Sequence, residues 1–461
     1  MGEERRRHEM ERYAIQKMEE WHAGKGRKPL VLMGARQVGK TWLMEAFAER
    51  FYPGRWVRVD LQRDERLRNR IEESGPDPKA IVDWVQATTG KAVREGETLL
   101  AIDEIQESPK ALNALKFFAE TMPGLAVMAA GSLLGVAVGK TPGKRAESRR
   151  ESFPVGKVSF LDVWPMTFAE FVRTVGNAFL AEGIGKGDWK LVGGMRAEYE
   201  NLYRKYLFTG GMPEAVAAFA ESGDYGKVRN IQADLLRAYD ADFAKHATAP
   251  LLSKIRLLWR CIPSQLAKEN RKFVYTAMKS GARAREYEEA LGWLDDAGMV
   301  HRVFRVSPPG LPLGACRDFS AFKLYLHDVG LLGAMAGLDA RTLLDGNELF
   351  SNFKGAMTEQ FVLQEMVAAG VEPDYWSADT GNAEVEFVVQ GAGGVVPIEA
   401  KAGLNTKAKS LKVYRERFKP PFAIRTSLQP RHDGGEVQDV PLYAFGAQIA
   451  AMLGGGNRAL A

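Results

Sequence analysis

The feature that most constrains the fold is a short apolar segment followed by a glycine-bounded turn and a helix-patterned segment. Residues 28–33 are apolar after the first lysine, residues 34–41 form the turn, and apolar residues recur with helical spacing over residues 41–51. A strand, a loop and a helix in this order are typical of the start of an α/β domain.

The segments that follow repeat this alternation. Apolar runs at residues 56–59, 98–102 and 125–130 alternate with helical patterns at residues 78–93 and 110–121. This order favours a parallel sheet whose strands are joined by crossover helices.

The turn matches the pattern G-x-x-x-x-G-K-[ST], and it lies between a strand and a helix as that pattern requires. In this motif the glycines let backbone N–H groups approach phosphates, the lysine reaches the β- and γ-phosphate oxygens, and the hydroxyl binds Mg²⁺. The sequence therefore predicts a nucleoside triphosphate site formed by Gly34, Ala35, Arg36, Gln37, Val38, Gly39, Lys40 and Thr41.

Two acidic residues follow the apolar run at residues 98–102. We expect Asp103 to hold Mg²⁺ through water and Glu104 to orient or deprotonate the attacking water. An acid beside the metal ligand favours hydrolysis over phosphoryl transfer to a small molecule. Lys40 and Glu104 are thus the candidate catalytic residues.

The apolar run that begins at residue 125 is followed by Ser132, whose hydroxyl is a candidate contact to the γ-phosphate; an ordinary turn explains this serine equally well. The basic residues beyond it are either a solvated helix or the source of an arginine finger for a neighbouring subunit. They are Lys144, Arg145, Arg149 and Arg150.

Several further segments, together with the turn, resemble a prokaryotic family of predicted AAA+ ATPases that carry a C-terminal domain of unknown function. They are residues 102–106, 130–134, 152–158, 209–216 and 240–246. The resemblance implies ATP and Mg²⁺ as cofactors and assembly into a homo-oligomeric ring.

The sequence predicts four domains in an α/β protein. A P-loop AAA+ ATPase domain with a parallel sheet covers residues 1–165, and a helical subdomain covers residues 166–250. A winged-helix-like domain is expected over residues 251–310, and a restriction-endonuclease-like α/β domain over residues 311–461.

In the last of these domains, acidic residues and a lysine follow the order seen in restriction-endonuclease-like nucleases. Glu359 lies on a predicted helix, Glu386 on a strand, and Glu399 and Lys401 at the end of the next strand. Alternation along a strand places Glu399 and Lys401 on one face, where acids can bind a metal ion and a lysine can activate water.

One position departs from the nuclease pattern, because those enzymes usually carry Asp where this chain has Glu386. The longer side chain changes where a metal ion would sit. The domain is therefore interpreted either as a metal-dependent nuclease or as a nuclease-like fold that binds nucleic acid or protein or serves as structure.

The expected winged helix carries basic residues suited to phosphate contacts, but acidic residues on its helix oppose them. DNA binding and packing against protein stay equally open for it. The basic residues are Arg271, Lys272, Lys279, Arg283, Arg285, Arg302 and Arg305; the acidic ones are Glu286, Glu288, Glu289, Asp295 and Asp296.

The formal net charge of +5 suits an anionic partner without establishing one. No apolar run reaches the roughly 20 residues that cross a bilayer, and the charged N-terminus is unlike a signal peptide, so we expect a cytoplasmic protein without membrane contact. The main hypothesis is an ATPase whose turnover drives a conformational or assembly change acting on DNA or a protein partner. The alternatives are an ATP-gated nuclease and a non-catalytic, ATP-dependent switch.

Overall fold

The structure is a computed structural model that describes residues 10–131, 156–268, 271–345, 351–380, 382–404 and 409–454. The chain divides into two compact units. The first unit is Arg12–Trp164 with Asp296–Gly298. The second is Pro165–Asp295 and Met299–Ala461 with Met1–Glu11.

The first unit contains a five-stranded sheet in the order β2-β3-β4-β1-β5, in which every neighbouring pair is parallel. This confirms the predicted parallel sheet. The strands are β1 (Leu30–Met33), β2 (Trp56–Asp60), β3 (Leu99–Asp103), β4 (Ala126–Ala130) and β5 (Ser159–Asp162).

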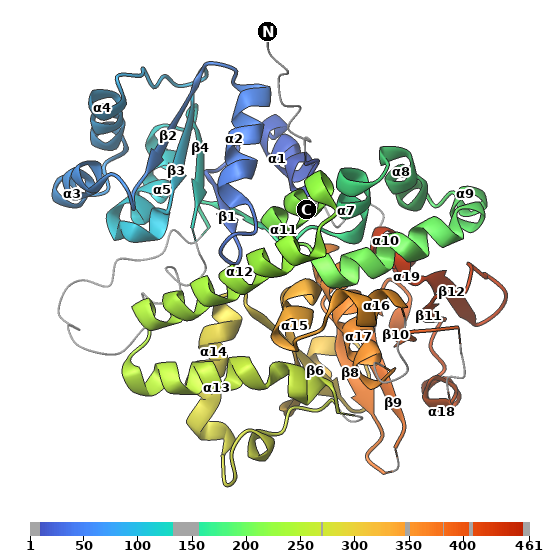
Figure 1. The fold of residues 1–461 in the computed structure, drawn as a ribbon. Coiled ribbons are helices and arrows are strands. Elements are labelled where there is room, and N and C mark those ends of the chain that lie inside the picture. Colours follow the sequence, from blue (N-terminus) through green and yellow to red (C-terminus); the bar gives the residue numbers. More distant parts are fainter. Residues whose placement is uncertain are drawn as a thin grey trace. The chain divides into compact units, whose positions relative to one another are not determined.

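Helices cover both faces of this sheet (Figure 1). One face packs in a buried core against α3, α4 and α5, through residues such as Val57, Leu100, Ile71, Val85 and Phe118. The other face is covered by α2, with α1 packed against it. The helices are α1 (Tyr13–Ala23), α2 (Lys40–Phe51), α3 (Glu65–Ser74), α4 (Pro78–Thr89) and α5 (Pro109–Thr121), with a 3₁₀ helix at Ile105–Glu107.

Parallel pairing places the carboxyl ends of β1 and β3 at the same edge of the sheet. β4 lies between these two strands. The turn that follows β1 and the acids that end β3 therefore meet at one edge, which is where ligands bind in sheets of this kind.

The second unit begins with a series of helices. They are α7 (Phe168–Val175), α8 (Ala178–Lys186), α9 (Trp189–Gly194), α10 (Arg196–Thr209), α11 (Pro213–Ser222), α12 (Tyr225–His246), α13 (Ala249–Leu266) and α14 (Ala284–Asp296), with a 3₁₀ helix at Tyr275–Ala277 between the last two. A short turn at residues 210–212 separates α10 from α11.

The second unit also holds a seven-stranded mixed sheet in the order β12-β11-β10-β9-β8-β6-β7. Its strands are β6 (Val300–Val306), β7 (Arg317–Leu326), β8 (Asp374–Ser377), β9 (Glu384–Gly391), β10 (Gly394–Ala400), β11 (Ala423–Ser427) and β12 (Val437–Pro441). The associated helices are α15 (Val329–Met335), α16 (Ala340–Asp345), α17 (Ser351–Ala368), α18 (Lys409–Phe418) and α19 (Leu442–Met452), with a 3₁₀ helix at Leu313–Cys316.

The sheet crosses the boundary that the sequence placed at residue 310. β6 pairs antiparallel with β7 and parallel with β8, where Arg305 lies opposite Tyr375 and Val306 opposite Trp376. β6, which lies inside the range expected for the winged-helix-like domain, thus belongs to the same sheet as the strands of the predicted nuclease-like domain. Pairing between segments about 70 residues apart leaves no local trace in the sequence.

A buried polar contact holds the turn between α10 and α11 against the start of α15. The carboxylate of Asp328 accepts hydrogen bonds from the backbone N–H of Gly211 (2.6 Å) and of Leu331 (2.9 Å). Gly210 has φ +72°, and a Cβ there would lie 2.2 Å from Asp328 Oδ1. The paired glycines are therefore required by this close approach.

A second buried carboxyl, that of Glu365 on α17, accepts a hydrogen bond from the backbone N–H of Phe168 at the start of α7 (2.8 Å). Burial raises the pKa of Glu365 to about 8; the Phe168 N–H opposes this rise and the nearby Glu170 adds to it. At neutral pH the folded chain therefore holds this group mainly in its protonated form.

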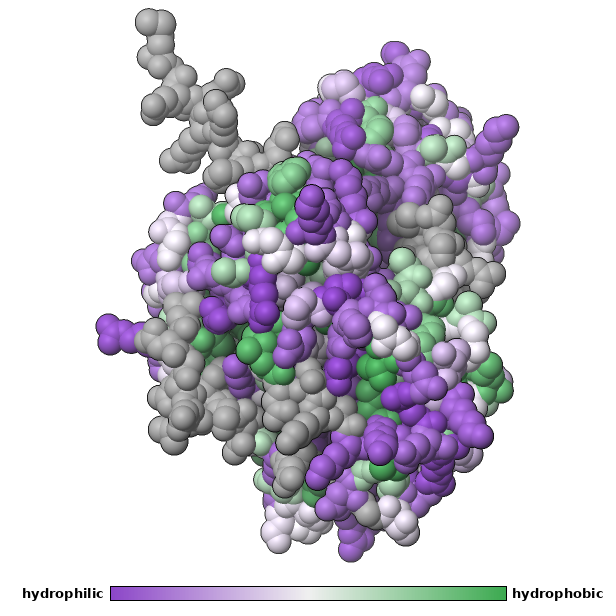
Figure 2. All heavy atoms as spheres, turned by 90° about the vertical axis from the view of Figure 1, so that its right-hand side faces the viewer, coloured by the Kyte–Doolittle hydropathy of each residue, from purple (hydrophilic) through white to green (hydrophobic). Residues whose placement is uncertain are grey.

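Hydrophilic residues cover most of the described surface on the face seen in Figure 2, with hydrophobic residues in separate patches between them. Within the described part of the chain, no helix combines the length and the apolar character that crossing a membrane requires.

Candidate functional site

The predicted phosphate loop lies between β1 and α2 and requires glycine at both ends. Gly34 has φ +146°, and a Cβ there would lie 2.2 Å from the carbonyl oxygen of Val163. Gly39 has φ +94° at the N-terminus of α2, and Gln37 also has a positive φ, of +64°. The loop therefore combines left-handed turns with the N-terminal end of a helix, an arrangement that directs N–H groups at an anion.

Lys40 begins α2, and its side chain turns back over the loop. Its ammonium group donates hydrogen bonds to the carbonyl oxygens of Gly34 (2.9 Å) and Ala35 (2.7 Å). Burial lowers the pKa of Lys40 to about 8, although Glu104 and Asp103 oppose this shift. The ammonium of Lys40 thus lies within the loop, near the two acids at the end of β3, Asp103 and Glu104.

Thr41 and Asp103 come together as the sequence predicts. The Thr41 hydroxyl donates a hydrogen bond to Asp103 Oδ2 (2.9 Å). The same oxygen accepts a hydrogen bond from Arg58 Nη2 (2.7 Å), and Asp103 is almost fully buried. Arg58 comes from β2, the neighbour of β3. No local sequence pattern marks Arg58, because only the order of the strands places it beside Asp103.

Glu104 follows Asp103 with φ +51°, which turns its side chain out of the strand direction. Its carboxylate accepts a hydrogen bond from the side-chain amide of Gln106, in the 3₁₀ helix that follows. A Cβ on Gly131, just after β4, would lie 2.6 Å from Gln106 Oε1. Gln106 therefore lies between Glu104 and the end of β4, a position that the sequence pattern did not reveal.

Arg12 is a further residue that the motif did not reveal. Its guanidinium donates hydrogen bonds to the carbonyl oxygen of Val38 in the loop (3.0 Å) and to that of Trp164 (2.7 Å). Arg36, another of the residues predicted for the nucleotide site, belongs to the same loop. Ser132 and the basic residues Lys144, Arg145, Arg149 and Arg150 lie outside the described residues.

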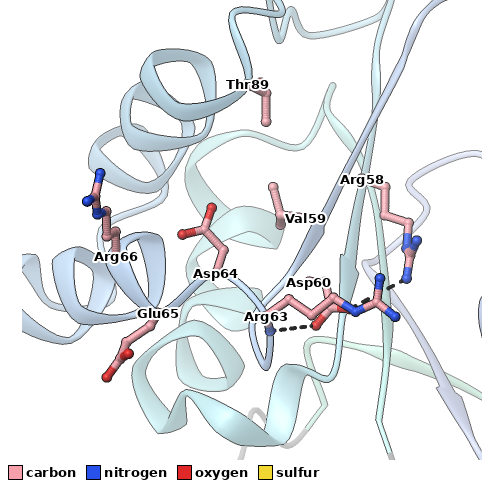
Figure 3. Close-up of a pocket in the computed structure, with 8 residues that line it drawn as sticks. All are labelled: Arg58, Val59, Asp60, Arg63, Asp64, Glu65, Arg66 and Thr89. Carbon is pink, nitrogen blue, oxygen red and sulfur yellow. Dashed lines mark hydrogen bonds and ion pairs between the residues drawn. The ribbon is translucent and has the colours of Figure 1, made fainter.

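An open pocket of about 560 Å³ adjoins this site at the carboxyl end of β2. Arg58, Asp60 and Arg63 lie together at one end of it, and Thr89 lies at the other (Figure 3). Asp60 Oδ2 is 3.7 Å from Arg58 and 3.5 Å from Arg63. Because Arg58 also binds Asp103, one side chain links this pocket to the phosphate loop.

The segment that carries this site matches a known family of domains. Residues 26–172 match an AAA domain. The AAA domain is followed by two matches to domains of unknown function, DUF8612 at residues 200–342 and DUF4143 at residues 354–445.

Among solved structures, the chain is similar to a Walker-type ATPase of Pyrococcus abyssi, with 14% identity, a TM-score of 0.43, and coverage of 70% of this chain and 94% of that chain. It is also similar to the ORC1 protein of Aeropyrum pernix, solved in complex with DNA, with 15% identity, a TM-score of 0.28, and coverage of 70% and 91%. Among curated proteins, none matches the chain.

In the second unit, the residues of the predicted nuclease-like site lie close together, but as ion pairs. Lys401 Nζ lies 3.4 Å from Glu386 Oε1 and also contacts Glu399. Glu359 pairs with Arg271 and accepts a hydrogen bond from the Tyr325 hydroxyl (3.0 Å). Each of the four predicted residues therefore already has a partner within the cluster.

Burial raises the pKa of Glu386 well above its usual value, and the neighbouring Glu399 adds to this rise. One buried oxygen of each of these two carboxyls has no hydrogen-bond partner among the described residues. Within those residues, no three acidic, His or Cys side chains form a group that could hold a metal ion. The four predicted residues thus form a buried cluster of ion pairs.

Proposed function

We propose that the AAA domain binds Mg²⁺-ATP at the loop of residues 34–41 and hydrolyses it. The observation that carries this proposal is the contact between Thr41 and Asp103, 2.9 Å apart, next to a loop whose first residue tolerates no side chain. A hydroxyl and a carboxylate are oxygen ligands of the kind that Mg²⁺ prefers, with water and phosphate oxygens as the remaining ligands.

The roles follow from where the side chains lie. The backbone N–H groups of the loop and the N-terminus of α2 would hold the phosphates, and the Lys40 ammonium would move from its carbonyl partners to the phosphate oxygens. Mg²⁺, held by Thr41 and Asp103, would neutralise charge on the β- and γ-phosphates. Glu104 would orient the attacking water and accept its proton, with Gln106 fixing the carboxylate.

Two variants test the proposal. Lys40→Ala removes the cation, and we expect loss of both ATP binding and turnover. Glu104→Gln keeps the size and the hydrogen-bonding capacity of the side chain but removes the base, so we expect ATP binding to persist while turnover falls by about 10² or more. Wild-type turnover in the Lys40 variant would refute the site. Unchanged turnover in the Glu104 variant would refute the assigned base.

The wider hypothesis is that turnover drives a conformational or assembly change that acts on DNA or a protein partner in the cytoplasm. A homo-oligomeric ring belongs to the same hypothesis, since the family resemblance implies it. Both stay predictions. Measuring molecular mass with and without an ATP analogue tests the second; a mass that stays monomeric in both conditions would exclude the ring.

A further inference from the structure

The second unit contains a pocket of about 690 Å³ that is distinct from the ATP site and from the buried charge cluster. It is formed by α13, by the start of α14 and by the segment that joins them. Its lining residues are Ser253, Lys254, Arg256, Leu257, Arg260, Lys279, Glu286 and Tyr287.

The helical period of α13 explains why these residues share the pocket. Ser253, Arg256, Leu257 and Arg260 are spaced i, i+3, i+4 and i+7, so they lie on one face of the helix. The opposite face is buried through residues such as Leu258. The helix is therefore anchored on its apolar side and presents a basic side to the pocket.

The charges of the pocket are unbalanced. Lys254, Arg260 and Lys279 have no side-chain ion pair or hydrogen bond to any described residue, whereas Arg256 is held by Asp240 through two hydrogen bonds of 2.8 and 2.7 Å. The one acid in the lining, Glu286, lies in the first turn of α14. Three cations are thus free to bind an anionic ligand.

The spacing of these cations favours a polymer over a single anion. Lys254 and Arg260 are six residues apart, which is about 9 Å along a helix. One phosphate group does not span that distance, whereas successive phosphates of a nucleic acid strand carry charges at regular, closer intervals. Leu257 and Tyr287 add apolar surface, which suits a sugar or base better than a purely ionic partner.

We propose that this basic groove, defined by its eight lining residues, binds the phosphate backbone of a nucleic acid. The groove differs from the winged-helix surface expected from the sequence. Of that surface, Arg271 pairs with Glu359, Arg302 with Asp295 and Arg305 with Asp379, so these three cations are neutralised within the chain. Of the residues expected there to contact phosphates, Lys279 is the one that lines the groove.

The test uses the full chain and fluorescein-labelled DNA, single-stranded and duplex, with binding measured by anisotropy over a series of KCl concentrations. The variant is Lys254→Gln, Arg260→Gln and Lys279→Gln together. The matched control is Lys190→Gln, Arg341→Gln and Lys409→Gln, which removes the same charge at three positions outside the groove that are exposed. ATP binding and thermal unfolding of both triple variants check that they are folded.

We expect the groove variant to bind DNA at least about tenfold more weakly than the control. We also expect the slope of log affinity against log salt to fall by about two to three, since each lost phosphate contact removes about 0.9. Lys40→Ala should bind DNA like the wild type without nucleotide, so failure of the ATPase proposal would leave this result intact.

Three outcomes would overturn the proposal. They are no DNA binding by the wild type, equal weakening in the control variant, or groove-dependent binding of a polyglutamate peptide in place of DNA. The last outcome would assign the groove to an acidic protein partner.

Discussion

Arg58 Nη2 lies 2.7 Å from Asp103 Oδ2, the oxygen that also accepts the hydroxyl hydrogen of Thr41. A carboxylate that is expected to hold Mg²⁺ is therefore already paired with a guanidinium from the neighbouring strand. The position and charge of Asp103 thus depend on β2 as well as on β3.

The first prediction concerns the Mg²⁺ requirement. A guanidinium at this oxygen repels a second cation, so Arg58→Ala should lower the Mg²⁺ concentration for half-maximal ATPase rate, by about threefold to tenfold, as loss of one charge-assisted hydrogen bond allows. The measurement is ATPase rate against free Mg²⁺ at saturating ATP. Arg63→Ala is the control, because its exposed side chain contacts Asp60 and makes no contact with Asp103. An unchanged Mg²⁺ dependence in the Arg58 variant would show that Arg58 and Mg²⁺ do not compete for Asp103.

The second prediction concerns pH. Burial lowers the pKa of Lys40 to about 8, and phosphates bind its protonated form. Above pH 8 the nucleotide-free chain loses this proton, so ATP affinity should fall with rising pH, by at most tenfold per unit, and binding should take up a proton. Calorimetry in buffers of different ionisation enthalpy measures that uptake. Proton release, or no proton exchange above pH 8, would contradict the assignment.

The third prediction concerns stability. The folded pKa of Glu365, about 8, lies above its usual value of 4.5, so the folded state holds a proton that the unfolded state loses. Its contribution is fully present below pH 4.5 and decreases as the pH rises to 8, by at most about 1.4 kcal/mol per unit. Glu365→Gln keeps an oxygen for the Phe168 N–H and should flatten this decrease. Urea unfolding between pH 5 and 8 measures it, with the exposed Glu198→Gln as control; a slope equal to the wild type would refute the raised pKa.

The fourth prediction separates a structural charge cluster from a nuclease site. Lys401→Ala leaves Glu386 and Glu399 without their shared cation, so the free energy of unfolding should fall by up to about 3–5 kcal/mol. The triple variant Glu386→Gln, Glu399→Gln, Lys401→Met removes the ammonium and both carboxyls together and should recover most of that loss. Chemical denaturation measures both effects.

The Lys401→Ala variant also tests whether the charge cluster is a nuclease site. Labelled DNA incubated with Mg²⁺ or Mn²⁺ should show no cleavage that depends on Lys401, because Lys401 is paired with both acids and Glu359 with Arg271. Lysine-dependent cleavage would restore the nuclease hypothesis.

Local patterns were sufficient to predict much of the fold. The strand, loop and helix around residues 30–51 form as expected, and the structure brings Thr41 and Asp103 together. The strand, loop and helix could be predicted because the motif couples residue identity to a required backbone geometry, as Gly34 does through its approach to Val163.

The contacts that sequence reasoning missed depend on which strands are neighbours. Arg58 reaches Asp103 only because β2 borders β3. Gln106 contacts Glu104 locally, but its position beside Gly131 depends on β4 being the neighbour of β3. No sequence pattern singled out in the analysis above predicted β7. Long-range strand pairing is not encoded in local periodicity, so the seven-stranded sheet could not be assembled from spacing alone. The order of Glu359, Glu386, Glu399 and Lys401 did predict that these residues lie close together, but it did not predict the ion pairs among them.

The pairing of β6 with β8 determines how this chain can be divided into domains. β6 and β7 lie in the segment matched to DUF8612, whereas β8 to β12 lie in the segment matched to DUF4143, yet all seven strands form one sheet. Separating the segments would leave the edges of β6 and β8 without partners, which invites aggregation. The segments matched to DUF8612 and DUF4143 are therefore parts of one folding unit. We expect a chain that contains one of these segments to contain the other as well.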